Sequence, residues 1–172
     1  MHLASVESAL ALLVELGAPS HLVRHHQLVA EAGAELCDGL VAAGIDGFDR
    51  VEVLVGAALH DAGKTLHPHE MHGGSSEHER AGHRLLLECG VPERIARHAW
   101  THAAWGDQEE LEPVLVALAD KLWKGKRVAA LEEHAVRLLA GGRDFWRVWG
   151  EVDPVFETVA AAGDERLMRS AV

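Results

Sequence analysis

The spacing of apolar residues constrains the fold of this chain more than any other feature of the sequence. These residues recur at intervals of three and four, whereas the two-residue alternation of a half-buried strand is absent. Glycine and proline lie between the periodic segments, where they end one helix before the next begins. The sequence therefore predicts an all-α protein. The predicted helices cover about residues 5–16, 20–43, 46–59, 77–88, 92–103 and 110–123, with one or two more after Lys124.

Local signals predict where several of these helices begin and end. Ser20 is the predicted N-cap of the second helix, because its hydroxyl can accept a hydrogen bond from a free backbone N–H. Gly63 is the predicted C-cap of the third helix. Residues 65–76 are predicted to form a polar loop, and Gly141–Gly142 and Asp153–Pro154 are expected to interrupt the last part of the chain.

The chain is acidic, and its length suits one domain over residues 1–172. Its 172 residues include 16 Lys and Arg against 27 Asp and Glu, for a formal charge of −11. This charge argues against nucleic acid or an anionic membrane as a partner. No apolar run approaches the roughly 20 residues that span a bilayer, and the first residues lack the basic region of a signal peptide. The expected compartment is the cytoplasm. We interpret Cys37 and Cys89 as small buried apolar residues.

Several histidine and aspartate side chains lie in segments that are otherwise apolar. His60 and Asp61 follow residues 51–59, an apolar run typical of a central buried helix. Asp120 lies in a second apolar run, and His25 lies on the apolar stripe of the second helix. Such side chains are costly to bury without partners. With 13 histidines in the chain, the sequence predicts a metal site of nitrogen and oxygen ligands, assembled from separate helices of a bundle.

The order of these residues and their local contexts carry a family resemblance. The segments HHQLVA, ALHDAGK and LADKL, in this order, resemble the HD-domain superfamily of metal-dependent phosphohydrolases. The resemblance covers about residues 20–127. It implies an HD-domain helical bundle, with an added C-terminal helical segment over about residues 128–172.

The resemblance also implies a first set of four metal ligands. His26 competes with His25 for one position, since both could face the apolar stripe, and the family's spacing to a valine that matches Val29 selects His25. The implied ligands are His25, His60, Asp61 and Asp120.

Some HD families carry two further histidines that bind a second metal ion. Here His78 and His102 resemble them, and His98, one helical turn before His102, could substitute for it or line the pocket. The resemblance thus implies two divalent ions per chain with Asp61 as their bridge. The ions would be manganese, iron or another metal such as nickel, zinc or magnesium.

The residues near these ligands suggest how a phosphorylated substrate would bind and react. Asp61 would orient a hydroxide between the two metals, and Lys64 matches a family lysine that meets a phosphate oxygen. We predict both as catalytic, with Lys64 and His98 also in the substrate pocket. A basic patch offers further substrate-binding residues, and three tryptophans are predicted to wall the pocket. The patch consists of Lys121, Lys124, Lys126 and Arg127, and the tryptophans are Trp100, Trp105 and Trp123.

The predicted function is hydrolysis of a small phosphorylated metabolite, of the nucleotide phosphomonoester or phosphoanhydride type, by metal-activated water. A di-iron HD-domain oxygenase and a non-catalytic nucleotide-binding regulatory module remain alternatives.

Two other groups of residues are not predicted to bind metal or substrate. His67, His69 and His72 are expected to be solvated or to form a lid. Phe145, Trp146, Trp149 and Phe156 recur at helical spacing, which favours core packing or a homodimer interface.

Overall fold

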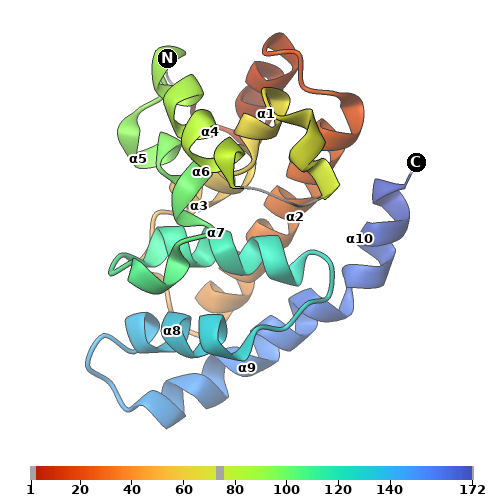
Figure 1. Ribbon diagram of the computed structural model, residues 1–172. Coiled ribbons are helices and arrows are strands. Elements are labelled where there is room, and N and C mark those ends of the chain that lie inside the picture. The colour runs from red at the N-terminus through yellow and green to blue at the C-terminus, as the bar shows by residue number, and fades with distance from the viewer. Residues whose placement is uncertain (1–2, 73–75, 172) are drawn as a thin grey trace.

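Three helices pack on one another at the centre of the molecule: α2 (Ser20–Ala42), α3 (Arg50–Ala57) and α7 (Leu111–Leu122) (Figure 1). The structure is a computed structural model that describes residues 3–72 and 76–171, and all regular secondary structure in these residues is helical. Almost every residue of α7 is buried, because its apolar run leaves no polar face for solvent. The all-α prediction is confirmed.

A group of short helices packs beside this centre. The helix α4 (Glu77–Glu88) contacts the 3₁₀ turn η1 (Ala62–Thr65) and the helix α6 (His98–Thr101). The prediction of a single helix over residues 92–103 is wrong, because this segment forms two separate helices, α5 and α6, that meet at Arg97. The Arg97 side chain is held there by carboxylates of other segments. The remaining elements before residue 123 are α1 (Val6–Glu15), η2 (Pro68–His72), α5 (Glu93–Ala96) and η3 (Trp105–Asp107).

Three further helices follow, where the sequence predicted one or two: α8 (Ala129–Ala140), α9 (Phe145–Ala161) and α10 (Gly163–Ser170). In Figure 1, α9 runs past α8, and α10 continues from the end of α9 and contacts α2. A buried arginine, Arg166, attaches α10 to the core. It donates to the Val159 carbonyl oxygen at 2.8 Å and pairs with the carboxylate of Glu35 on α2.

The interruption predicted at Asp153–Pro154 is wrong, because Pro154 lies inside α9. A proline in a helix removes one backbone hydrogen bond and crowds the carbonyl four residues earlier. Here that residue is the exposed Gly150, whose carbonyl solvent can reach. The break predicted at Gly141–Gly142 is confirmed, since both glycines have positive φ, 52° and 90°.

One predicted helix cap and one predicted helix start are also wrong. Ser20 is the first residue of α2 and makes no capping hydrogen bond, because the extended backbone of Pro19 already sets the N-cap position. The third helix begins at Arg50 rather than at about residue 46, since the Asp49 side chain caps it by accepting from the Glu52 N–H at 3.0 Å.

Gly63 is not a helix C-cap with positive φ; it is a point of backbone contact between η1 and α4. A Cβ at Gly63 would overlap the carbonyl oxygen of His78 and lie 2.6 Å from the backbone nitrogen of Gly82. A Cβ at Gly82 would in turn lie 2.7 Å from the Gly63 nitrogen. The two glycines therefore let the main chains of η1 and α4 touch directly. The predicted loop over residues 65–76 contains part of η1 and all of η2, so it is more regular than expected.

Two remaining expectations concern burial. Cys37 is buried as predicted, whereas Cys89 is only half-buried because it lies just past the end of α4. Within the described ranges, no helix is both long enough and apolar enough to cross a membrane.

Candidate metal centre

The fold brings together all six predicted metal ligands from five separate places in the chain. They come from α2, the turn after α3, the first turn of α4, the end of α6 and the last part of α7. All but one are nearly excluded from solvent, and the side chain of His25 is 21% exposed. The six residues are His25, His60, Asp61, His78, His102 and Asp120.

The Asp61 carboxylate lies between two pairs of histidines. Its Oδ2 atom is 3.5 Å from His25 Nε2 and 3.4 Å from His60 Nε2. Its Oδ1 atom is 3.1 Å from His78 Nε2 and 3.5 Å from His102 Nε2. Asp61 thus belongs to two separate groups of three potential ligands, one for each oxygen.

Three of these histidines use Nδ1 for a hydrogen bond and turn Nε2 towards Asp61. The Nδ1 atom of His60 donates to the Ala57 carbonyl oxygen at 2.8 Å, and that of His102 donates to the His98 carbonyl oxygen at 3.0 Å. The Nδ1 atom of His78 donates to the carboxylate of Glu70. These acceptors set the tautomer that leaves the Nε2 lone pair facing inward, which is the usual support of a metal-binding histidine.

Two of the inward nitrogens lack any hydrogen-bond partner among the described residues. The Nε2 atoms of His25 and His60 are buried, yet no donor or acceptor satisfies them. A buried nitrogen of this kind costs about 1 to 3 kcal/mol when it is left unpaired. A cation between these nitrogens and the Asp61 oxygens would remove that cost, so the donor set fits a divalent metal.

The pKa values indicate the same need for positive charge. Burial alone would raise the pKa values of Asp61 and Asp120, but the neighbouring His60 holds both carboxyls well below their usual range. Burial alone would lower the pKa of His60, but the two carboxylates raise it to about 9. Burial lowers the pKa of His102 to about 4, helped by the charge of His60. The buried carboxylates therefore favour positive charge beside them, which a bound divalent ion would supply.

His26 lies behind the centre rather than in it. The His26 side chain is fully buried, with Nδ1 at 3.4 Å from the Ala57 carbonyl oxygen and its ring 5.0 Å from that of His60. It belongs to neither ligand group, whereas His25 points at Asp61.

A cavity of about 550 Å³ opens over the ligands. Lys64 Nζ lies 2.5 Å from Asp61 Oδ2, and Lys121 Nζ lies 2.5 Å from Asp120 Oδ2, so each lysine pairs with a ligand carboxylate. Lys124 and Trp123 also line the cavity, as predicted. Three polar lining residues were missed by the sequence analysis: His21, Glu79 and Ser170.

A signal for one missed residue was present in the sequence. His21 precedes His25 by four residues, so a helix places both on one face. No local signal exists for Ser170, which reaches the cavity only because α10 packs against α2.

Several residues predicted for substrate binding do not line this cavity. His98 is fully buried, with Nε2 at 3.2 Å from Glu52 Oε1. Arg127 is turned towards the C-terminal helices, where it pairs with Glu132, Asp153 and Glu157. Lys126, Trp100 and Trp105 are also absent from the lining.

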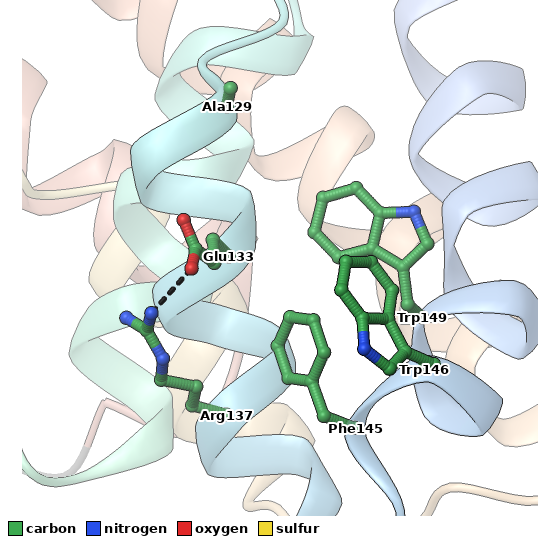
Figure 2. Close-up of a pocket in the computed structure, with 6 residues that line it drawn as sticks. All are labelled: Ala129, Glu133, Arg137, Phe145, Trp146 and Trp149. Carbon is green, nitrogen blue, oxygen red and sulfur yellow. Dashed lines mark hydrogen bonds and ion pairs between the residues drawn. The ribbon is translucent and has the colours of Figure 1, made fainter.

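The C-terminal aromatic residues form a separate pocket (Figure 2). Phe145, Trp146 and Trp149 face Glu133 and Arg137 of α8 across a cavity of about 420 Å³. Trp146 is 74% exposed, whereas the fourth residue of the predicted stripe, Phe156, is fully buried in the core. Core packing is thus confirmed for Phe156, and Phe145 and Trp149 pack partly buried against the same core, whereas the homodimer stays a prediction.

The geometry defines a class of protein: an α-helical bundle whose buried His and Asp side chains form a candidate centre for divalent metals. Comparison with protein-family models then gives the family. Residues 21–123 match the HD domain, and the chain belongs to this family, with further helices beyond the matched segment. The buried His and Asp clusters agree with the metal site typical of HD domains. Comparisons with curated proteins and with solved structures give no match.

Proposed function

We propose that this protein is a metal-dependent phosphohydrolase that acts on a small phosphorylated metabolite of the nucleotide phosphomonoester or phosphoanhydride type. The observation that carries the proposal is the position of Asp61, whose two oxygens face two different pairs of histidine nitrogens. One carboxylate placed in this way can serve two ions at once.

The ligands divide into two sets that share Asp61. His25, His60 and Asp120 would hold one ion with Asp61, while His78 and His102 would hold the other. Two bound divalent ions would supply a Lewis acid for the phosphoryl group and a bound water with a lowered pKa. The nitrogen and oxygen donors suit manganese, iron or zinc, and magnesium less well.

The residues around the ligands would orient the substrate. Lys64 and Lys121 each lie beside a ligand carboxylate, where an ammonium group can also meet a phosphate oxygen. Lys124 adds a third ammonium, and burial lowers its pKa, which makes its charge more dependent on an anionic partner. Trp123 offers an apolar wall, T-shaped to the ring of His25 at 5.0 Å. The cavity size of about 550 Å³ suits a small ligand.

The first experiment measures phosphate release from a panel of nucleotides and sugar phosphates with added manganese. It compares the wild type with Asp61→Ala and with the control Asp46→Ala, which removes an exposed aspartate outside the centre. We expect turnover of at least one substrate in the wild type and the control, and none in Asp61→Ala. Metal content measured on the same samples should fall only in Asp61→Ala.

Any one of three results would contradict the proposal. Turnover that survives Asp61→Ala would place the chemistry elsewhere. No phosphate release by the wild type, together with oxygen consumption in the iron-loaded protein, would favour the di-iron oxygenase. Tight nucleotide binding without turnover would favour the regulatory module.

A further inference from the structure

A second group of potential ligands lies beside the metal centre, where the sequence analysis expected only solvated histidines. His67 and His69 flank the start of η2, Glu70 lies within it, and Glu77 begins α4. Their ligand atoms all lie within 4.8 Å of one another. We call these four residues the outer cluster. The side chain of His72, the third histidine of this segment, lies outside the described residues.

The geometry of the outer cluster is close to that of a metal site. His67 Nδ1 is 3.9 Å from both Glu70 Oε1 and Glu77 Oε2, and His69 Nε2 is 3.7 Å from Glu70 Oε1. These separations exceed hydrogen-bonding distance. They approach the ~3.3 Å between two ligands of a tetrahedral zinc ion with bonds of about 2.0 Å. The side chains of His69 and Glu77 are 67% and 71% exposed, so rotation can bring them closer.

Glu70 is the fixed member of the cluster, because its side chain is only 1% exposed. Its Oε2 atom accepts from the ring of His78 and from the His78 backbone N–H, the latter at 3.2 Å. Its Oε1 atom faces His67 and His69. The carboxylate is thus held in place by one metal-centre ligand, with its second oxygen directed at two imidazoles.

The chemistry of the donors selects the ion. Two imidazoles with two carboxylates suit zinc and similar divalent transition metals, whereas calcium and magnesium prefer oxygen ligands alone. The six predicted ligands around Asp61 are called the inner centre. We propose that the outer cluster is a separate binding site for one zinc-type divalent ion, connected to the inner centre through Glu70. This site does not depend on the proposed function.

The test counts zinc ions per chain after equilibrium dialysis against buffered zinc, with metal measured by mass spectrometry. The double variant His67→Gln with His69→Gln should bind one zinc fewer than the wild type. The control His83→Gln removes another half-buried histidine that also faces a glutamate, Glu93 at 3.0 Å, but that belongs to no group of three potential ligands among the described residues. It should bind the wild-type number. An unchanged count in the double variant would overturn the proposal.

A second variant guards against misfolding of the first. Asp61→Ala disables the inner centre and leaves the outer cluster intact, so it should still bind one Co²⁺ ion with the intense visible absorption of a tetrahedral site. Adding His67→Gln and His69→Gln to Asp61→Ala should remove that absorption. Absence of bound Co²⁺ in a folded Asp61→Ala protein, with folding checked by circular dichroism, would also overturn the proposal.

Discussion

The inner centre and the outer cluster use similar ligands but differ in how the protein holds them. In the inner centre, His60 is fully buried and three histidines are oriented through Nδ1 by acceptors. In the outer cluster, His69 and Glu77 are mostly exposed, and only Glu70 is fixed. A site whose ligands are oriented in advance can hold metal in a reactive geometry, whereas a loosely held site can only bind it. The difference supports the two proposals, chemistry at the first site and ion binding at the second.

The largest expected effect comes from Asp61→Asn, which keeps the size of the side chain but removes the shared charge. Both halves of the inner centre lose a ligand, so we expect turnover to fall by at least about a thousandfold. Phosphate release at saturating manganese measures this. The cobalt signal of the outer cluster should not change, and its loss would mean that the two sites are not separate.

Protonation of Glu52 at acid pH should destabilise the fold around the inner centre. Burial alone would raise the pKa of Glu52, but hydrogen bonds from His98, Arg97 and Arg94 lower it from 4.5 to about 2. A lowered folded-state pKa stabilises the fold at pH values above about 4.5, and this stability is lost as the pH falls towards 2. We expect the free energy of unfolding to fall by about 2 to 3 kcal/mol over this pH range.

The matched variant for this prediction is Glu52→Gln, which cannot ionise. Urea unfolding of the metal-free proteins between pH 5 and 2.5 should show a shallower pH dependence in Glu52→Gln than in the wild type. Parallel curves would refute the assignment to Glu52. The wild-type protein at pH 5 should also be the more stable of the two, because the substitution removes the carboxylate that pairs with His98 and one of the two that pair with Arg97.

Glu70→Gln should weaken both sites, since Glu70 is their common residue. Loss of a carboxylate that supports a metal-binding histidine typically costs about 10- to 100-fold in metal affinity. We expect a loss of this size at the inner centre, measured by competition with a chelating dye. The control Glu88→Gln changes an exposed glutamate at the end of α4 and should have no effect. Equal affinities in Glu70→Gln and the wild type would show that His78 needs no carboxylate.

The smallest effect is expected from His67→Gln with His69→Gln on turnover. These side chains do not touch the cavity, and substitutions of this kind usually change stability by less than about 0.5 kcal/mol. Initial rates should therefore stay within about twofold of the wild type. A loss as large as that of Asp61→Asn would move the outer cluster into the catalytic machinery.

The sequence predicted the inner centre better than its surroundings, for a physical reason. His60, Asp61 and Asp120 follow or lie in apolar helices, where a buried polar side chain requires a partner, and the order of their motifs carries the family resemblance that identified them as a set. The role of Glu70 is not visible in this way, because it depends on a 3₁₀ turn that brings Glu70 back to His78.

Two other features depended on packing that the sequence pattern does not encode. His98 follows the spacing of a pocket residue, yet its ring is fixed by Glu52, 46 positions earlier, so it supports α6 from behind. Arg127 was predicted as part of the basic patch at the cavity, but its guanidinium pairs instead with Asp153 and Glu157 of α9. The helices after residue 128 were predicted, whereas their contribution of Ser170 to the cavity was not.

The contact between Gly63 and Gly82 has a consequence for how this protein can change over evolutionary time. Asp61 lies two residues before Gly63, and His78 lies four residues before Gly82, so the spacing of these two ligands is set by main chain against main chain. No side chain there can be enlarged or trimmed to adjust it. The cavity wall, in contrast, is built from side chains such as Trp123 and Ser170. Mutation can therefore reshape the cavity wall while the spacing of Asp61 and His78 is inherited unchanged.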